Sequence, residues 1–493
     1  MSFFDDHMVE LQKEHATNLL GSVNPYTGLR LADDPAVAFV EINNENGLLQ
    51  NWFSGLLDTM PAVFRNELNA RCNTWLQARY ASTAELLAAW GHRIDPLGPN
   101  KLDNGDFAAG TIGWNIGRHS GAQATATTPA DFNGQAALKV QVTAPGSANW
   151  HVQINQSGKS LTAGRLYTIS FYARASKPIT IYAGIQRAHT DWAALGPSMS
   201  PALTTEWQHF TITFEAAVDE SNARLNFGGF GNQLVTVWLA DVHWHEGGEI
   251  GGLPEGVTLE AGNIPSIAYA PTSGGDTADA RRDWVRFLRD REIDYWTTMY
   301  RHIKDTIGYR GIVFGTIIAN SPPNIQAQLD VVDSHAYWRH PMFPNNPWDP
   351  VDWIVENVSM VNDPLGSTIA SIARQRVRGK PHTVTEYQHP APNTYSAEAP
   401  LLAAAYGALQ DWDGIWMFAY DTDDADHFTG FFEQAHHSTK MANMLLAAAL
   451  FRRGDIRPAR RRYTMAFDPE TEIRTIESKG TAWRVGDGSH LGV

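Results

Sequence analysis

The alternation of hydrophobic and polar residues changes its period along the chain, beginning with a helical stretch. Asp5 is a candidate N-cap, and apolar residues then recur at helical spacing; they are Met8, Leu11, Ala16 and Leu19. Residues 36–42 form a short, nearly continuous apolar run, which is typical of a buried parallel strand. A stretch rich in Leu, Trp and Ala follows and ends near Trp90. The first part of the chain therefore predicts a helix and then a strand-helix unit.

From about residue 99 to residue 247 the pattern changes to short alternating segments separated by Gly, Ser, Thr and Asn. Alternation of apolar and polar positions indicates strands with one buried face. The clearest segments are residues 137–142, 167–172, 210–214 and 235–239. Short strands at this spacing predict an all-β sandwich, and we expect its form to be a jelly roll.

Helical periodicity returns after Gly247, first in a long helix that starts near Thr277. Strand-like runs then alternate with helical ones; the runs cover residues 311–318, 331–337, 382–386 and 414–420. This alternation indicates a parallel α/β architecture, which the all-β block interrupts. The last part of the chain is loosely strand-like. The predicted segments are therefore 1–98 and 248–465 for the two parts of the α/β domain, 99–247 for the inserted sandwich and 466–493 for a C-terminal extension.

The composition excludes several classes of partner. The formal charge of −15 would repel a phosphate backbone, so we expect no nucleic acid partner. No run approaches the roughly 18 consecutive apolar residues of a membrane-spanning helix, so we expect no membrane partner. The single cysteine, Cys72, excludes an internal disulfide. The N-terminus lacks the features of a secretion signal, and the localisation stays open. Aromatic residues reach 11%, and many lie in Pro- or Gly-rich loops, where exposed rings suit the apolar faces of sugars.

Two glutamates follow predicted strands at positions that suit glycoside chemistry. Glu45 comes just after the strand of residues 36–42, and Glu386 closes the strand at residues 382–386. In a β/α barrel the strand ends open onto one face, so residues far apart in sequence meet there. Retaining glycoside hydrolysis needs two carboxyl groups about 5 to 5.5 Å apart. Between the two glutamates, His335 and Tyr337 alternate at the end of another strand.

An Asn-Glu pair after one strand, His-x-Tyr after a second, Glu after a third and Trp on a fourth resembles glycoside hydrolase clan A, the cellulase-like group of the family-five type. The resemblance implies that Glu45 is the acid/base and Glu386 the nucleophile. It also implies that Asn44 binds the sugar 2-hydroxyl, that Tyr337 hydrogen-bonds Glu386, and that His335 lines the site. Trp416 would be the platform beneath the sugar.

Each of these residues also has a structural reading. A lone Asn-Glu pair is common, and His335 or Trp416 alone would more often belong to a core. Their joint order on successive strand ends favours the active-site interpretation. Trp338, Phe343 and Trp348 lie in a Pro-rich loop beside the predicted site, where they either stack on a polysaccharide or pack the loop. The sequence leaves both alternatives open.

The inserted block resembles carbohydrate-binding modules of the family-four/nine type. The motifs that carry the resemblance are Asn104-Gly105-Asp106-Phe107, Trp150-His151-Val152-Gln153, Glu206-Trp207-Gln208 and Trp238-Leu239-Ala240-Asp241-Val242. Such modules bind sugars with aromatic and amide side chains on one sheet face. The candidates here are Trp150, Gln153, Gln186, His189 and Trp192. A structural calcium is frequent in these modules, and Asp106 and Asp241 are the candidate ligands. Alternatively, the sandwich only shapes one wall of the catalytic cleft, and its aromatic residues form core.

The resemblance also implies that part of the barrel is missing. If residues 36–42 are the fourth strand of a (β/α)8-type barrel, the chain contains strands four to eight only. The clan usually places an Arg on the second strand and a His on the third, and this sequence supplies neither. The first strand of an open parallel sheet would expose unpaired backbone. A second copy of the chain in a homo-oligomer, the inserted module or the C-terminal tail would have to cover that edge.

The sequence thus predicts a retaining β-glycoside hydrolase that needs no cofactor for catalysis. The expected partner is a β-linked polysaccharide or oligosaccharide, with β-glucan or cellulose-like chains as the first candidates. The alternative is a non-catalytic carbohydrate-binding protein derived from such an enzyme. Linkage preference and endo or exo action depend on loop shapes that the sequence does not predict.

Overall fold

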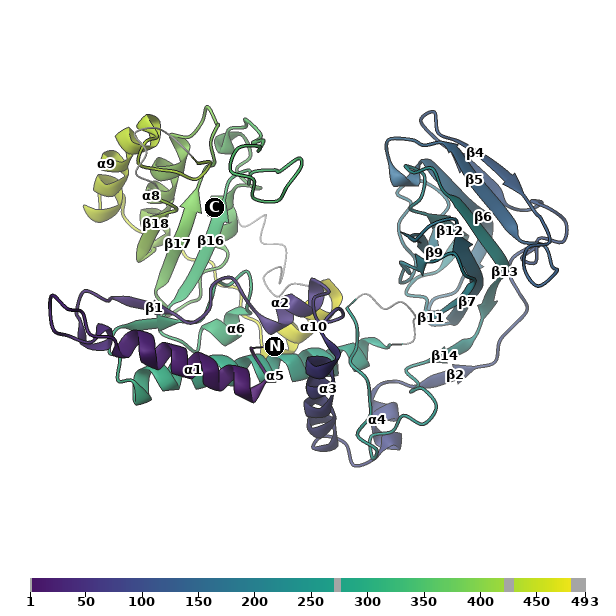
Figure 1. Ribbon diagram of the computed structural model, residues 1–493, viewed down its shortest axis with the longest axis horizontal. Helices are drawn as coiled ribbons and strands as arrows, with labels where there is room; N and C mark the ends of the chain where they lie inside the picture. Colours follow the sequence, from purple (N-terminus) through teal and green to yellow (C-terminus); the bar gives the residue numbers. More distant parts are fainter. Residues whose placement is uncertain (1, 270–275, 421–429, 480–493) are drawn as a thin grey trace. The chain divides into compact units, whose positions relative to one another are not determined.

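The structure is a computed structural model that describes residues 2–269, 276–420 and 430–479 (Figure 1). The chain divides into two compact units. Residues 1–56 together with 285–493 form the first unit, and residues 57–284 form the second. The first unit mixes helices with parallel strands, and the second contains the β-sandwich, so the predicted combination of an α/β part and an all-β part is confirmed.

The strands of the first unit are all parallel. They are β1 (Phe39–Glu41), β15 (Ile312–Phe314), β16 (Val332–Tyr337), β17 (His382–Gln388) and β18 (Gly414–Met417). β1 pairs with β15, and β16, β17 and β18 form a three-stranded sheet in that order. A parallel bridge between Ile317 and Asp333 joins the segment after β15 to β16. Within the described residues these strands do not close into a barrel.

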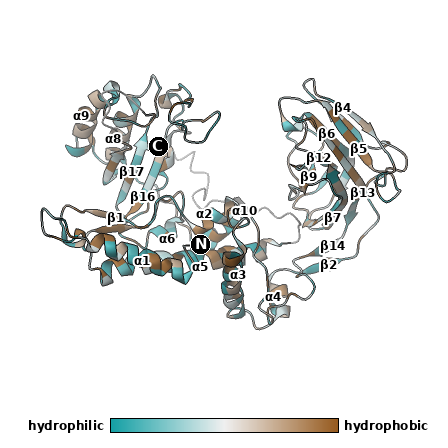
Figure 2. Cartoon of the chain, viewed as in Figure 1, coloured by the Kyte–Doolittle hydropathy of each residue, from teal (hydrophilic) through white to brown (hydrophobic). Residues whose placement is uncertain are grey.

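Helices accompany these strands (Figure 1). They are α1 (Asp6–Gly21), α2 (Leu48–Phe53), α5 (Ala278–Arg301), α6 (Pro323–Gln326), α7 (Thr368–Ala373), α8 (Glu398–Gln410), α9 (Ser438–Arg452) and α10 (Pro469–Lys479), with the short turns η1 (Leu31–Asp33), η3 (His302–Thr306) and η4 (Met360–Asn362). Most carry both hydrophobic and hydrophilic residues, as Figure 2 shows, because one side packs while the other meets solvent. Among the described residues no helix is both long and apolar enough to cross a membrane.

Helix α1 begins where the sequence predicts, but it packs through a different face. The Asp5 carboxylate accepts a hydrogen bond from the backbone N–H of Met8 at 2.8 Å, which confirms the N-cap. Leu11 and Leu19 are exposed, whereas Leu20 is buried in a cluster with Ile303 and Val313. The predicted apolar face is therefore wrong in part. Helix α1 packs against η3 and β15 through Leu20, which lies next to the predicted face.

Strand β17 contains a bulge that decides which way Glu386 points. Ser334 pairs with Val384, and the next residue of β16, His335, pairs with Glu386, so Thr385 is the extra residue. Val384 and Tyr387 both pack in the core beside α7 and α8. Regular alternation would turn Glu386 to the same side as Val384. The bulge instead turns Glu386 to the side of His335.

The second unit begins with two helices and contains the sandwich. The helices are α3 (Ala62–Gln77) and α4 (Thr83–Ala89), and Cys72 is buried in α3. A two-stranded sheet of β2 (Arg93–Asp95) and β14 (Gly248–Ile250) brings the two ends of the sandwich segment together. The sandwich strands are β3 (Asn115–Arg118), β4 (Gln123–Thr127), β5 (Leu138–Ala144), β6 (Val152–Leu161), β7 (Leu166–Ala175), β8 (Ile179–Thr180), β9 (Tyr182–Arg187), β10 (Ala202–Leu203), β11 (Gln208–Glu215), β12 (Glu220–Gly228) and β13 (Thr236–Glu246), with the turn η2 (Asn149–His151).

The sandwich packs two antiparallel sheets around one apolar core. One sheet has the order β11-β7-β13-β5-β4 and the other β3-β6-β12-β9. The alternating residues Ile169, Phe171 and Ala173 of β7 point into the core, where they meet Ile154 of β6 and Phe227 of β12. The period-two pattern in the sequence has the expected physical cause in strands such as β5 and β7, where alternate side chains are buried.

The C-terminal part differs from its prediction. The sequence reads as loosely strand-like there, yet residues 469–479 form α10. Ile473 and Ile476 are buried at helical spacing, and Glu472 accepts a hydrogen bond from Arg289 of α5 at 3.1 Å. Tertiary packing of one short apolar stripe stabilises this helix. The rest of the predicted extension, residues 480–493, lies outside the described residues.

Candidate active site and carbohydrate-binding face

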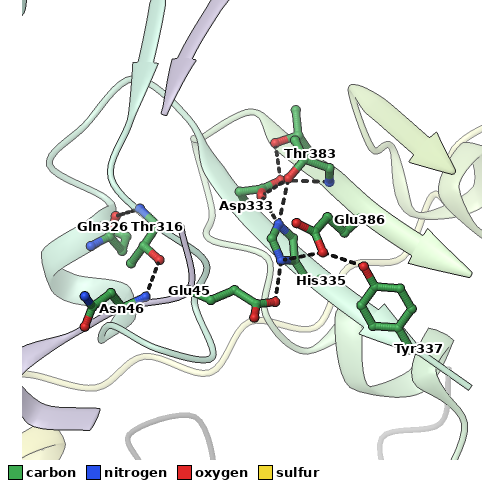
Figure 3. A network of polar contacts seen from close by, with 10 residues as sticks. Glu45, Asn46, Thr316, Gln326, Asp333, His335, Tyr337, Thr383 and Glu386 are labelled. Atoms are coloured by element: carbon green, nitrogen blue, oxygen red, sulfur yellow. Dashed lines mark hydrogen bonds and ion pairs between the residues drawn. The ribbon is translucent and has the colours of Figure 1, made fainter. Parts of the chain in front are cut away.

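The ends of β1, β16 and β17 bring the predicted catalytic residues together (Figure 3). Glu45 Oε1 lies 2.7 Å from Nδ1 of His335, and the same nitrogen lies 3.5 Å from Oε2 of Glu386. The nearest ligand atoms of all three side chains lie within 4.8 Å of one another. The Tyr337 hydroxyl donates a hydrogen bond to Glu386. Two carboxyl groups far apart in sequence thus face each other across a short gap.

His335 is held from its other side by Asp333. The His335 Nε2 lies 2.9 Å from Oγ1 of Thr385 and 3.4 Å from Oδ2 of Asp333. Asp333 is fully buried and also accepts hydrogen bonds from the Thr383 hydroxyl at 2.6 Å and the Thr385 backbone N–H at 3.2 Å. The buried Asp333 therefore fixes the orientation of the imidazole between the two glutamates.

The charges of the site follow from these contacts. Burial lowers the pKa of His335, but the hydrogen bonds to Asp333 and Glu45 and the charge of Glu386 outweigh it and raise that pKa to about 9. The hydrogen bond from His335 lowers the pKa of Glu45. Burial, followed by the bond to Glu386, raises the pKa of Tyr337. At neutral pH His335 is therefore a cation, Glu45 is ionised and Tyr337 keeps its proton.

Glu41 is a further carboxyl beside this cluster. Phe39 and Glu41 share one side of β1, and the ring of Phe39 lies 5.4 Å from that of Trp416 on β18. Val40 and Ile42 lie on the other side, against the cluster formed by α1 and η3. Burial raises the pKa of Glu41 to about 7; the charge of His335 opposes this rise, and the charges of Asp333, Glu386 and Glu45 add to it. Its Oε1 is buried and makes no hydrogen bond to any described residue.

The remaining candidates of this site divide into exposed and buried residues. Asn44 is exposed beside Glu45, Trp416 is 41% exposed on β18, and Trp348 is 62% exposed. Trp338 is only 3% exposed, and its Nε1 donates a hydrogen bond to the Val358 carbonyl at 2.9 Å. For Trp338 the structure favours the loop-packing alternative, because its side chain is buried in a core cluster and the Arg339 guanidinium lies 4.5 Å from the centre of its ring.

Trp348 belongs to a set of aromatic rings that reaches the carboxyl pair. The ring of Tyr337 stacks on Phe432 at 4.3 Å, and Phe432 contacts Phe431 at 4.8 Å. Phe343 then contacts both Phe431 and Trp348, at 5.6 Å and 5.3 Å. Phe431 and Phe432 come from a segment that the sequence gave no reason to connect with the site, since no periodic element contains them.

Asp333 and Thr385 were also missed by the sequence reasoning. The signal for Asp333 was present, because Asp333, His335 and Tyr337 alternate and must share one side of their strand. No local signal marks Thr385, since a bulge depends on the pairing of β17 with β16. Glu41 is not among the site residues that the sequence predicts.

Two carboxylates and an imidazole also have the composition of a metal site, although the proton on His335 disfavours metal binding. Glu45, His335 and Glu386 are the only group of three such side chains that the described residues bring together. A metal ligand must present an unprotonated nitrogen. The pKa of His335, about 9, keeps a proton on the ring at neutral pH. The arrangement therefore suits proton transfer between His335 and a carboxylate.

In the second unit the predicted sugar-binding residues lie around the sheet β3-β6-β12-β9. Gln153 follows the half-exposed Trp150 onto β6, and its amide nitrogen donates to the Trp150 carbonyl at 3.0 Å. Gln186 lies on β9, with the exposed His189 and the half-exposed Trp192 just beyond it. The five residues thus form two groups, one at the start of β6 and one at the end of β9, and these strands flank β12.

Strand β12 places two polar residues between these groups. The guanidinium of Arg224 donates to Gln186 Oε1 at 3.0 Å and lies 4.5 Å from the centre of the Trp192 ring. Asn226 lies between Asn155 of β6 and Gly184 of β9, and its Oδ1 is buried without a hydrogen bond to any described residue. Amide groups between two half-exposed tryptophans suit the hydroxyls and the flat faces of sugar rings.

The predicted calcium ligands, Asp106 and Asp241, lie in two neighbouring backbone segments. The backbone N–H of Val242, next to Asp241, donates to the Gly105 carbonyl, next to Asp106, at 2.9 Å. Asp241 Oδ1 contacts Nε2 of His243 at 2.8 Å, and Asp106 accepts from the backbone N–H of Ala108 at 3.2 Å. Both carboxylates therefore have protein partners, and calcium binding here stays a prediction.

Comparison with known proteins identifies the sandwich. Residues 99–229 match a family described as carbohydrate binding domain. A search of curated proteins found no match. Similar solved structures include the module CBM4 (26% identity, 30% of this chain and 99% of that chain, TM-score 0.27) and the N-terminal cellulose-binding domain of β-1,4-glucanase C from Cellulomonas fimi (23%, 31% and 97%, 0.23). TmCBM61, bound to β-1,4-galactotriose, is another (14%, 30% and 99%, 0.21). The family match supports carbohydrate binding by the sandwich.

Proposed function

We propose that the protein is a retaining β-glycoside hydrolase whose inserted sandwich binds the same class of carbohydrate. The observation that carries the proposal is the facing pair of Glu45 and Glu386, whose nearest oxygens lie within 4.8 Å. Retaining enzymes separate their carboxyls by about 5 to 5.5 Å, whereas inverting enzymes need roughly 6.5 to 9.5 Å to admit a water. The short gap favours retention.

The order of the parallel strands supports the resemblance to clan A. If β1, β15, β16, β17 and β18 are strands four to eight of a β/α barrel, then Glu45, His335, Tyr337, Glu386 and Trp416 fall where the clan has its site residues. The substrate class follows from this resemblance: a β-linked polysaccharide or oligosaccharide, with β-glucan or cellulose-like chains first.

The proposed reaction is a double displacement. The Glu386 carboxylate attacks the anomeric carbon, the bond to the leaving oxygen breaks, and that oxygen takes a proton from Glu45. A water molecule then gives a proton to Glu45 while its oxygen displaces Glu386 from the sugar. The Tyr337 hydroxyl, which donates to Glu386, stabilises the ionised nucleophile.

His335 supplies the proton that Glu45 needs. Glu45 is ionised beside the cationic His335, so in the resting site the pair holds one proton on Nδ1. Transfer along their 2.7 Å hydrogen bond produces a protonated Glu45 and a neutral His335. The acid is therefore formed by a short proton shift, which substrate binding favours by removing water from around both charges.

The test compares wild type with Glu386→Ala and Glu45→Ala on aryl β-glycosides and soluble β-glucans. We expect Glu386→Ala to lose turnover, because no nucleophile remains. Glu45→Ala should lose about 10²- to 10⁴-fold on substrates with poor leaving groups, the usual contribution of general acid catalysis. Turnover that survives both substitutions would exclude this assignment.

A second candidate function is a carbohydrate-binding protein without turnover. The match of residues 99–229 to a carbohydrate binding domain favours it, since that match concerns the sandwich alone. The same experiment separates the two candidates. Wild-type protein that binds β-glucans and never cleaves them supports the second, and cleavage that depends on Glu386 supports the first.

A further inference from the structure

A fully buried carboxylate lies outside the cluster that faces the substrate. Glu292 of α5 is 0% exposed. It accepts hydrogen bonds from the Leu49 backbone N–H at 2.9 Å, from Nε1 of Trp296 at 3.3 Å and from the Ser321 hydroxyl. Burial raises its pKa to about 6, although these donors oppose the rise. A buried charge costs free energy unless it is fully hydrogen-bonded. We therefore expect the role of this carboxylate to be to hold the three groups that donate to it.

Two of those partners belong to the two loops that border Glu45. Leu49 is the second residue of α2, which follows the loop that carries Glu45, and Ser321 lies in the segment after β15. A methyl group in place of the Gly47 hydrogen would lie 2.1 Å from the Asn320 carbonyl oxygen, so the two loops touch at their backbones. Glu292 therefore bonds both loops at the point where they meet.

A chain of hydrogen bonds leads from Ser321 to the residue after Glu45, and Figure 3 shows its part from Gln326 to Asn46. The Gln326 amide nitrogen donates to Ser321 Oγ at 2.8 Å, and its Oε1 accepts from the Thr316 backbone N–H at 3.2 Å. The Thr316 hydroxyl oxygen then accepts from the Asn46 backbone N–H at 3.2 Å. All of these groups except Asn46 are buried.

Glu45 itself needs such support. Its φ is +45°, in the left-handed region that non-glycine residues avoid. The amide nitrogen of Asn320 donates to the Glu45 carbonyl oxygen at 2.8 Å. The backbone that aims the Glu45 carboxylate at His335 is thus held by the segment that Glu292 bonds.

We propose that Glu292, acting through Leu49, Ser321 and Asn320, is the positioning residue that holds the Glu45 carboxylate at the His335 imidazole. The inference rests on the proposed function for its kinetic consequence, and on the geometry alone for its effect on His335. A displacement of about 1 Å in a catalytic group costs on the order of 100-fold in rate.

His335 gives a readout that does not depend on turnover. It faces Glu45, Glu386 and Asp333, with Glu41 farther away, and of these Glu45 is the carboxylate in the loop that Glu292 bonds. If Glu292→Gln displaces Glu45, the pKa of His335 falls from about 9 toward its ordinary value. Histidine-selective NMR titration of the full chain measures this pKa.

The experiment compares Glu292→Gln and the milder Asn320→Ala with wild type, Glu45→Gln and the control Glu398→Gln. Glu398 of α8 is a matched control because it also accepts from a serine hydroxyl, at 2.6 Å, and from a backbone N–H that begins a short turn, at 2.8 Å, but it holds η4 instead of the Glu45 loop. We expect the His335 pKa to fall in Glu292→Gln, Asn320→Ala and Glu45→Gln and to stay in Glu398→Gln.

The kinetic arm uses phenyl and 2,4-dinitrophenyl β-glycosides. A displaced acid should cost about tenfold or more on the phenyl glycoside, whose leaving group needs a proton, and much less on the dinitrophenyl glycoside. An unchanged His335 pKa in a folded Glu292→Gln variant overturns the inference, whatever Asn320→Ala shows. If Glu292→Gln fails to fold, Asn320→Ala decides alone. Wild type without turnover contradicts the proposed function, and the titration still decides the inference.

Discussion

His335 is the residue on which the chemistry of both glutamates depends. Its two nitrogens contact Glu45 and Thr385, and Glu386 and Asp333 lie within 3.5 Å. The ring is a cation up to about pH 9 because its carboxylate neighbours outweigh its burial. The contact with His335 keeps Glu45 ionised at neutral pH and also gives it a neighbouring proton donor. The pH above which activity is lost should therefore follow the loss of the proton that His335 and Glu45 share.

The first prediction concerns that limit in His335→Asn. Below about pH 9 the wild-type pair keeps one proton, so kcat/KM on a phenyl β-glycoside should fall only as the pH rises through about 9. Without His335 the pKa of Glu45 returns toward its ordinary value of about 4.3, and the proton is lost in acid. The basic limb should move down by several pH units.

The profile is measured in a Glu41→Gln background, since Glu41 also titrates near pH 7. Glu45→Gln in the same background serves as control and should show no limb from the pair. A basic limb that stays in place after His335→Asn would show that His335 does not protonate Glu45.

Glu41 makes the stability of the first unit depend on pH. Its folded pKa of about 7 lies above the unfolded value, so its contribution is present in acid and is lost as the pH rises through about 7. The loss is about 2 kcal/mol once its partial exposure is allowed for. One oxygen of Glu41 accepts no hydrogen bond from any described residue, and the charge of His335 offsets the burial only in part.

The second prediction is that Glu41→Gln removes this pH dependence. Urea unfolding at pH 5 and pH 8 should show wild type losing stability relative to the variant, because the glutamine never ionises. Glu14→Gln, on the exposed face of α1, is the control and should leave the difference unchanged. Equal changes in wild type and Glu41→Gln between the two pH values would contradict the prediction.

At the scale of elements, the bulge in β17 matters more than any single contact. It adds Thr385 between the pairs Ser334–Val384 and His335–Glu386, and so turns the nucleophile away from the helices. The hydroxyl of Thr385 also donates to Asp333 and contacts His335 at 2.9 Å. The bulge thus lets two consecutive residues, Thr385 and Glu386, face the imidazole.

The third prediction is that deletion of Thr385 keeps the sheet and the direction of Glu386 but lowers turnover. Without Thr385 the strand is regular and Glu386 directly follows Val384, so Glu386 still faces His335 while Tyr387 stays on the core side. The variant loses the hydroxyl that contacts Asp333 and His335. The circular dichroism spectrum and β-glucan binding by the sandwich should be retained. Thr385→Val is the control that keeps the bulge and loses only the hydroxyl, so its turnover should fall to a similar extent. A deletion variant without turnover beside an active Thr385→Val would contradict this prediction.

The sequence predicted the elements with strong periodicity and missed those that depend on partners. The long helix near Thr277 and the sandwich strands were found because their patterns are repeated many times. Helix α10 was missed, since only Ile473 and Ile476 form its apolar stripe. The sequence left the role of Trp338 open, because a Pro-rich loop gives no information on which tryptophan turns inward.

The candidate site shows the same division. Glu45, Glu386, His335 and Tyr337 could be chosen from the sequence because all four lie at the ends of recognisable strands. Glu292 could not, since a glutamate in a long helix reads as a solvated residue until α2 is placed beside it. Contacts between distant segments have no local signal, and they decide both the bulge and the buried carboxylate.

At the scale of the whole molecule, the two units offer different chemistry for one kind of ligand. The first unit has the carboxyl pair, and the second has half-exposed tryptophans beside amides on β6, β12 and β9. If the sandwich only formed a wall of the active site, substitutions in it would change the hydrolysis of short and long substrates equally. If the sandwich binds polysaccharide, the same substitutions would change only the hydrolysis of substrates long enough to reach it.

The last prediction uses that difference. Trp150→Ala with Trp192→Ala should weaken binding of insoluble β-glucan by tenfold or more, since truncation of an aromatic anchor costs about 2 kcal/mol. Hydrolysis of that polymer should fall in step, while kcat and KM on aryl β-glycosides stay at wild-type values. Trp207→Ala is the matched control, because Trp207 stacks with Arg174 at the other sheet and should leave both substrates unaffected. A double variant that loses small-substrate turnover would assign the two tryptophans to the active site, and one that keeps full polymer affinity would exclude this face as the binding surface.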